Sequence, residues 1–135
     1  MFNGTVELRR LNKREWELLT DITYTNSDIS VTAKAGLITD GASVPKYLWG
    51  IVGSPFTGRY TRPALIHDAL YASERLLRKD CDNLFLEMME AENVAWLKRY
   101  SMYLAVRAGG YFVWKKHTQV TINDGKKYCQ VRRLK

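Results

Sequence analysis

The chain has 135 residues, 46% of them hydrophobic and 26% charged, which suits one globular domain that buries a core without metals or disulfides. It contains no apolar run of the roughly 18 residues that a membrane-spanning helix requires. Its start, MFNGTVELRR, lacks the basic and apolar regions of a signal peptide. We therefore expect no transmembrane segment and synthesis in the cytoplasm. Cys81 and Cys129 set no disulfide framework and are expected to be free thiols.

The first forty residues predict a small antiparallel sheet. Residues 4–11, GTVELRRL, alternate enough for one strand. Residues 15–40 hold two runs rich in Thr, Ile, Val and Tyr on either side of TNSD (25–28), whose residues favour a tight turn. Residues 41–60 contain four glycines and two prolines and predict a loop with at most one short helical turn.

Three helices are predicted to follow. Thr61 is expected to cap the first, which runs to about Leu76 with Pro63 in its first turn. The second is expected from Asp80 to about Ala91. The third covers residues 94–116 and is interrupted or closely packed at its two adjacent glycines.

The end of the chain, residues 117–135, predicts a hairpin that turns at NDG (123–125), or a single strand. The order of elements predicts one α+β domain: residues 1–40 rich in strands, residues 60–116 helical, and a basic C-terminal strand or hairpin.

Most of the net charge of +7 lies at the C-terminal end. After Trp114 there is one acidic residue, Asp124, against seven basic ones: Lys115, Lys116, Lys126, Lys127, Arg132, Arg133 and Lys135. Such a segment binds an anionic partner, or serves only as a solvated polar face. The chain has no base-reading motif. We therefore expect the partner of Lys126, Lys127, Arg132 and Arg133 to be another protein of an assembly or an anionic envelope surface, rather than nucleic acid.

The stretch ALIHDALYASERLLRKDCDNLF (64–85) carries the main candidate site. His67 and Tyr71 are four residues apart, so both project from one helical face. Asp82 lies near the start of the next helix, and an antiparallel pair would bring it opposite His67. A carboxylate on one imidazole nitrogen fixes the tautomer and leaves the other nitrogen free to accept a proton from water. The spacing predicts a general-base site of His67, Asp82 and Tyr71, with His67 and Asp82 roughly 2.6 to 3.2 Å apart or joined through one water.

The same residues also suit a non-catalytic interpretation, in which they form a buried polar network that fixes helix packing. A second carboxylate, Asp40 in TDGASVP (39–45), ends a strand, and together with Asp68 it is a candidate ligand for a divalent metal such as calcium or zinc. Ser43 is a poor candidate nucleophile, because its surroundings lack the Gly-x-Ser-x-Gly turn.

The third predicted helix has an aromatic stripe with steps of three or four residues. We expect it to face the core, with the arginine free to neutralise one of the three candidate aspartates. The stripe consists of Trp96, Tyr100, Tyr103, Arg107, Tyr111 and Trp114.

The ordered motifs TDGASVP, ALIHDALY, DCDNLF and MYLAVRAGG resemble a family of small phage and prophage proteins known as a domain of unknown function, over residues 36–114. The resemblance implies a phage or prophage origin, with synthesis in the host cytoplasm and a possible place in the virion or tail. It implies no activity.

His67, Asp68, Tyr71 and Asp82 are also similar to the active-site helices of phospholipases A-two. In that family the histidine activates water, the adjacent aspartate binds calcium, and the tyrosine and later aspartate hold the histidine. The calcium loop would here be WGIVGSPFTG (49–58), which lacks the family's Tyr-Gly-x-Gly order. Two functions follow as alternatives: an envelope hydrolase, or a non-enzymatic virion or tail component.

Overall fold

The computed structural model describes residues 1–40 and 58–135, which form two small antiparallel sheets and four helices. The four-stranded sheet has the order β1-β4-β5-β7, and the three-stranded sheet has the order β2-β3-β6. The strands are β1 (Phe2–Asn3), β2 (Leu8–Arg10), β3 (Trp16–Leu18), β4 (Ile22–Thr25), β5 (Ile29–Ala33), β6 (Ile38–Thr39) and β7 (Cys129–Arg133). The helices are α2 (Thr61–Ser73), α3 (Arg78–Ala91), α4 (Trp96–Trp114) and α5 (Gln119–Lys126).

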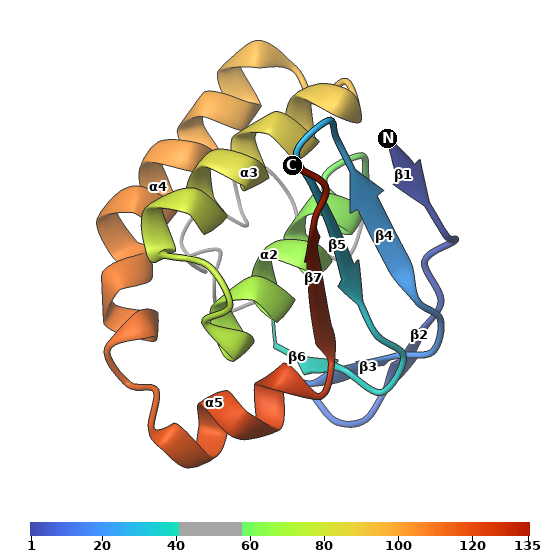
Figure 1. The fold of residues 1–135 in the computed structure, drawn as a ribbon, viewed down its shortest axis with the longest axis vertical. Helices are drawn as coiled ribbons and strands as arrows, with labels where there is room; N and C mark the ends of the chain where they lie inside the picture. Colours follow the sequence, from blue (N-terminus) through green and yellow to red (C-terminus); the bar gives the residue numbers. More distant parts are fainter. Residues whose placement is uncertain (41–57) are drawn as a thin grey trace.

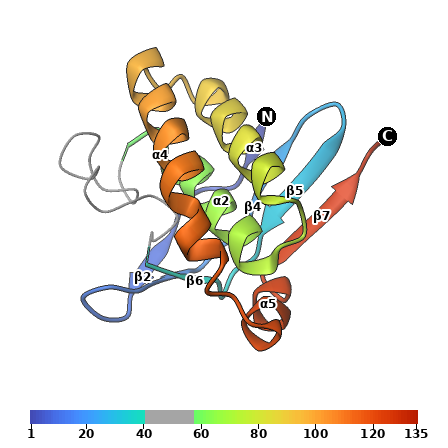
Figure 2. The same ribbon diagram turned by 90° about the vertical axis from the view of Figure 1, so that its left-hand side faces the viewer.

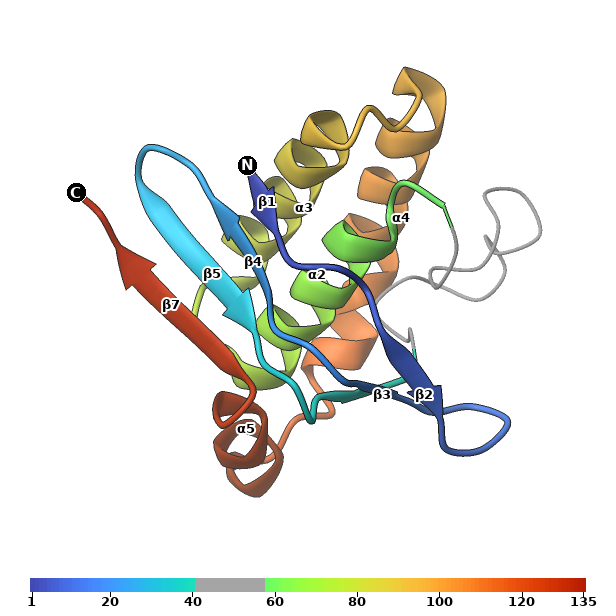
Figure 3. The same ribbon diagram turned by 90° about the vertical axis from the view of Figure 1, so that its right-hand side faces the viewer.

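The architecture is α+β, as predicted, and α2 lies at its centre. Figures 1 and 3 show α2 between the four-stranded sheet on one side and α3 and α4 on the other. Ten of the thirteen residues of α2 are buried, because this helix packs on both layers. Among the described residues, no helix is long and apolar enough to cross a membrane.

The central strands β4 and β5 alternate as a half-buried sheet requires. Their apolar side chains point to the core, while threonines and a serine occupy the other face, where Thr23 and Thr32 hydroxyls lie 2.8 Å apart. The expected turn is present, because Asn26 Oδ1 accepts the backbone N–H groups of Asp28 and Ile29. Within the predicted strand 4–11, however, only Leu8–Arg10 forms a strand, β2, and the preceding β1 (Phe2–Asn3) belongs to the other sheet.

The helix boundaries shift by up to three residues from those predicted, since α2 ends at Ser73 rather than at Leu76. Tyr60, not Thr61, is the N-cap of α2, and the Thr61 hydroxyl instead donates to the carbonyl of Gly58. Leu77 is the N-cap of α3, which places Asp80 in the first turn. The helix α4 is continuous through Gly109 and Gly110.

The predicted hairpin at the C-terminal end is wrong in its first arm. Residues 119–126 form α5, which Thr118 and Thr121 start with a reciprocal capping box. Gly125 does not sit in a hairpin turn but lets α5 approach α2, since a Cβ there would lie 2.3 Å from the Ala72 carbonyl oxygen. The second arm is a strand, β7, which pairs antiparallel with β5.

Most of the aromatic stripe of α4 does not face the core as expected, and of its aromatic members only Trp114 packs against the core of the described residues, edge-on to Tyr71. Trp96, Tyr100 and Tyr111 are exposed, and the inner face of the helix consists of Met102, Ala105, Val106 and Gly110. Both cysteines are buried free thiols, as predicted.

The position of β7 predicts the effect of truncation. A chain ending at Gly125 loses β7, and with it the buried Cys129 and all the pairs that β7 makes with β5. We expect this chain to lose cooperative thermal unfolding in circular dichroism, whereas a control ending at Arg133, which loses only exposed residues, should melt like the full chain. A cooperative melt of the Gly125 truncation within a few degrees of the full chain would show that β7 is dispensable.

Candidate active site

The carboxylate of Asp82 is the meeting point of three helices. Its Oδ1 accepts hydrogen bonds from His67 Nε2 (2.7 Å) and the Tyr71 hydroxyl (2.6 Å), both on α2. Its Oδ2 accepts from Arg107 Nη1 on α4 (2.7 Å) and from Arg78 Nη1 on α3 (3.3 Å). These five residues are called the Asp82 network below. The expected contact between His67 and Asp82 is therefore confirmed.

Helical spacing and close packing position these side chains. His67 and Tyr71 are one turn apart on α2, so both reach the same carboxylate oxygen. The His67 ring stacks on Phe85 at 4.5 Å between centroids and lies 4.3 Å from the Tyr71 ring. Gly110 leaves room for the Tyr71 hydroxyl, because a Cβ at this position would lie 2.4 Å from it.

The protonation states follow from burial and charge. His67 and Asp82 have 0% side-chain exposure. Burial lowers the pKa of His67, which its bond to Asp82 only partly offsets, and Arg78 lowers it further. Burial opposes ionisation of Asp82, but the hydrogen bonds from His67, Tyr71 and Arg107 hold the pKa of Asp82 below its usual value. Burial also raises the pKa of Tyr71, which keeps its hydroxyl protonated.

His67 is thus neutral at pH 7, and its tautomer follows from its partner. Because a carboxylate only accepts hydrogen bonds, Nε2 carries the proton and Nδ1 keeps a lone pair. Nδ1 is buried and has no hydrogen-bond partner among the described residues, 1–40 and 58–135. The hydrogen bond to Asp82 thus anchors Nε2 and leaves Nδ1 as the basic nitrogen, which is the ring form that general-base chemistry requires.

Arg107 was expected to be free to neutralise one of Asp40, Asp68 and Asp82, and the structure shows that it contacts Asp82. Arg78 was missed, although its i,i+4 spacing from Asp82 on one helix is a recognisable signal. Two arginines against one carboxylate leave the Asp82 network with a net positive charge while His67 is neutral. A second proton on His67 is therefore disfavoured.

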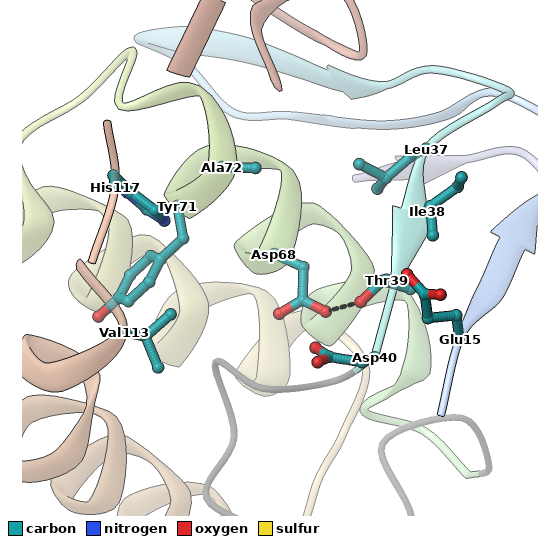
Figure 4. Close-up of a pocket in the computed structure, with 10 residues that line it drawn as sticks. All are labelled: Glu15, Leu37, Ile38, Thr39, Asp40, Asp68, Tyr71, Ala72, Val113 and His117. Atoms are coloured by element: carbon teal, nitrogen blue, oxygen red, sulfur yellow. Dashed lines mark hydrogen bonds between the residues drawn. The ribbon is translucent and has the colours of Figure 1, made fainter. Parts of the chain in front are cut away.

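Asp68 and Asp40 lie together at a separate pocket of about 260 Å³. Figure 4 shows both carboxylates at this pocket, with the Thr39 hydroxyl donating to Asp68. Tyr71 and His117 also line it, so the pocket and the Asp82 network share Tyr71. The pocket places the two predicted metal ligands side by side.

The described residues do not complete a metal site. Among them, no group of three or more His, Cys, Asp or Glu side chains is arranged to hold an ion, whereas calcium takes six to eight oxygen ligands. Ser43 and all but Gly58 of the expected calcium loop, 49–58, lie outside the described residues. Calcium or zinc binding by Asp40 and Asp68 thus stays a prediction, and no chemical step below depends on it.

Comparison with known proteins identifies relatives. A family model described as "Protein of unknown function (DUF1353)" matches residues 16–106. The uncharacterized protein y4jT of Sinorhizobium fredii (strain NBRC 101917 / NGR234) is 31% identical over 96 residues, which is 70% of this chain and 29% of y4jT. The uncharacterized protein y4iH of the same organism is 38% identical over 74 residues, 53% of this chain and 30% of y4iH. The chain spans less than a third of either relative, and no solved structure matches it significantly.

Loss of the central carboxylate should destabilise the fold. Asp82→Asn leaves two arginines and an imidazole facing a neutral amide. Removing one partner of a buried ion pair typically costs roughly 3 to 5 kcal/mol, and because both arginines keep some exposure we expect a loss of about 3 kcal/mol in the free energy of unfolding.

The matched control is Asp80→Asn, two residues earlier in α3, where the side chain is exposed. It should cost less than about 1 kcal/mol, since only its interaction with the helix N-terminus is lost. Urea unfolding followed by circular dichroism measures both variants. Equal losses would contradict the structural importance of the Asp82 network.

Proposed function

The chain belongs to the family described as protein of unknown function (DUF1353), and we propose that it is a hydrolase with His67 as its general base. One observation carries the proposal: Asp82 holds His67 Nε2, while Nδ1 is an acceptor to which no group in the described part of the chain donates. Tyr71 supports Asp82 in the way that the resemblance to phospholipases A-two implies. We further propose a phage or prophage origin and a lipid ester, or another bond of the cell envelope, as substrate.

In the proposed reaction, His67 Nδ1 takes a proton from water while the water oxygen attacks the carbonyl carbon of an ester. The imidazolium then gives this proton to the leaving alkoxide as the carbon–oxygen bond breaks. The products are an acid and an alcohol, and His67 returns to its neutral form. Asp82 keeps the ring oriented and offsets its transient charge.

The two arginines set the conditions for this reaction. Arg78 and Arg107 share Asp82 Oδ2, so they leave Oδ1 to His67 and Tyr71. Burial, and then the charge of Arg78, helps to keep His67 deprotonated, which supplies the base form at neutral pH. The same charge reduces the stabilisation that Asp82 gives to the imidazolium, and Asp82 must therefore act mainly through orientation.

A second candidate function rests on burial. The side chains of His67 and Asp82 are both inaccessible to solvent. The donors to Asp82 lie on three helices, α2, α3 and α4. Burial and cross-linking of the helices favour a purely structural polar network in a virion or tail component, whose partners would be other proteins of the assembly. The two functions make opposite predictions for substitutions of His67.

The variant His67→Gln distinguishes the hydrolase from the structural network. A glutamine can still donate a hydrogen bond toward Asp82 but has no basic nitrogen. If His67 is the base, this variant should stay folded and lose activity by roughly 100-fold or more. The assay measures fatty acid released from phosphatidylglycerol vesicles and soluble fragments released from purified cell envelopes, each with calcium, with zinc and with a chelator.

The matched control is His117→Gln, which changes the other histidine of the chain, bound to Glu74 at 2.8 Å. It should keep its activity. Undetectable hydrolysis by the unaltered protein, together with a loss of roughly 1 to 3 kcal/mol in stability for His67→Ala, would reject the hydrolase and favour the structural role.

A further inference from the structure

The outer face of α4 carries an exposed apolar stripe along the whole helix. Its members are spaced by one, three, four and seven residues, which places them on the side of the helix opposite its buried inner face. Leu97 is 71% exposed and Leu104 is 64% exposed. The stripe, called the α4 stripe below, consists of Trp96, Leu97, Tyr100, Leu104, Tyr111 and Phe112. Several large exposed apolar side chains gathered on one helix face mark an interaction site.

The sequence that carries the α4 stripe has no acidic residue. No aspartate or glutamate occurs from residue 93 to residue 123, while Lys98, Arg99, Lys115 and Lys116 fall within this span. Arg107 also lies there, but its charge is paired with Asp82. Lys115 Nζ lies 5.0 Å from the ring centroid of Phe112 and 5.4 Å from that of Tyr111, so cations and apolar rings share one surface. Figure 2 shows α4 on the opposite side of the fold from β4, β5 and β7 of the four-stranded sheet.

This chemistry matches an anionic membrane surface. Tryptophan and tyrosine favour the headgroup region, leucine and phenylalanine enter the acyl boundary, and lysine and arginine attract anionic headgroups. A second copy of the chain fits less well, because a twofold contact would bring two cationic faces together. Charge complementarity therefore favours lipid as the occupant.

We propose that the α4 stripe and its flanking lysines bind the surface of a membrane rich in anionic phospholipid. The proposal rests on the part of the proposed function that places the protein at the cell envelope, and it names the contacting surface. The C-terminal basic residues were expected to bind such a surface. We assign this contact to α4 instead. Binding does not require His67, so the two proposals can fail separately.

The test measures co-sedimentation of the folded protein with vesicles of phosphatidylglycerol and, as a comparison, phosphatidylcholine. The unaltered protein should bind the anionic vesicles at low salt and dissociate as salt rises, since screening shortens to about 8 Å at physiological ionic strength. Leu104→Glu should weaken binding by about tenfold or more, because it places a charge in the apolar contact. Its matched control is Leu77→Glu, because Leu77 is 74% exposed but lies at the start of α3.

A second pair of variants tests the charge. Lys98→Glu with Lys115→Glu should weaken binding by about tenfold or more. Lys126→Glu with Lys127→Glu makes the same charge change at α5 and should leave binding within about twofold of the unaltered protein. His67→Gln should bind vesicles normally, whatever its activity.

Several results would overturn the proposal. These are failure of the unaltered protein to bind anionic vesicles at low salt, equal binding to neutral vesicles, or equal losses for Leu104→Glu and Leu77→Glu. A loss confined to the Lys126 and Lys127 pair would return the contact to the basic end. If the protein does not bind vesicles but forms a dimer in light scattering, and Leu104→Glu dissociates this dimer, the α4 stripe binds a second copy of the chain instead of a membrane.

Discussion

The helical layer depends on one buried carboxylate. Asp82 has no exposure to water, and an unpaired charge in such a place would cost several kcal/mol. Its ionised form persists because α2, α3 and α4 each bring donors to it. The positions of the three helices relative to one another are therefore coupled to the hydrogen bonds of a single side chain.

The same interaction determines what His67 can do. Asp82 accepts a hydrogen bond from Nε2, so the proton of the neutral ring is on Nε2 and the lone pair is on Nδ1. Burial and the charge of Arg78 keep the ring neutral. A network built only for packing would be expected to satisfy both ring nitrogens, because an unpaired buried polar atom costs stability. The Nδ1 lone pair, to which no described residue donates, is what makes the hydrolase the first of the two proposed functions. The full burial of the ring is what supports the structural alternative.

The sequence predicted the core of the site because helical spacing is local. His67 and Tyr71 are one turn apart in any helix, and a short connection to the next helix brings Asp82 opposite them. The features that were missed depend on tertiary packing. Gly125 was assigned to a hairpin turn, but its function is the close approach of α5 to α2, which no local pattern reveals. The spacing of the α4 aromatic residues correctly predicted a shared face, yet Met102 and Val106 on the other face are the residues that enter the core.

The most direct test of the account is the protonation of His67, measured by ¹⁵N NMR of the imidazole nitrogens, with His117→Gln used to assign the signals. The account predicts a neutral ring at pH 7 with the proton on Nε2 and an unprotonated Nδ1. Because the pKa of His67 is lowered, this form should persist as the pH falls below 6.5, the usual value for histidine. A proton on Nδ1, or an imidazolium at pH 7, would contradict the account and remove the general base on which the proposed hydrolase depends.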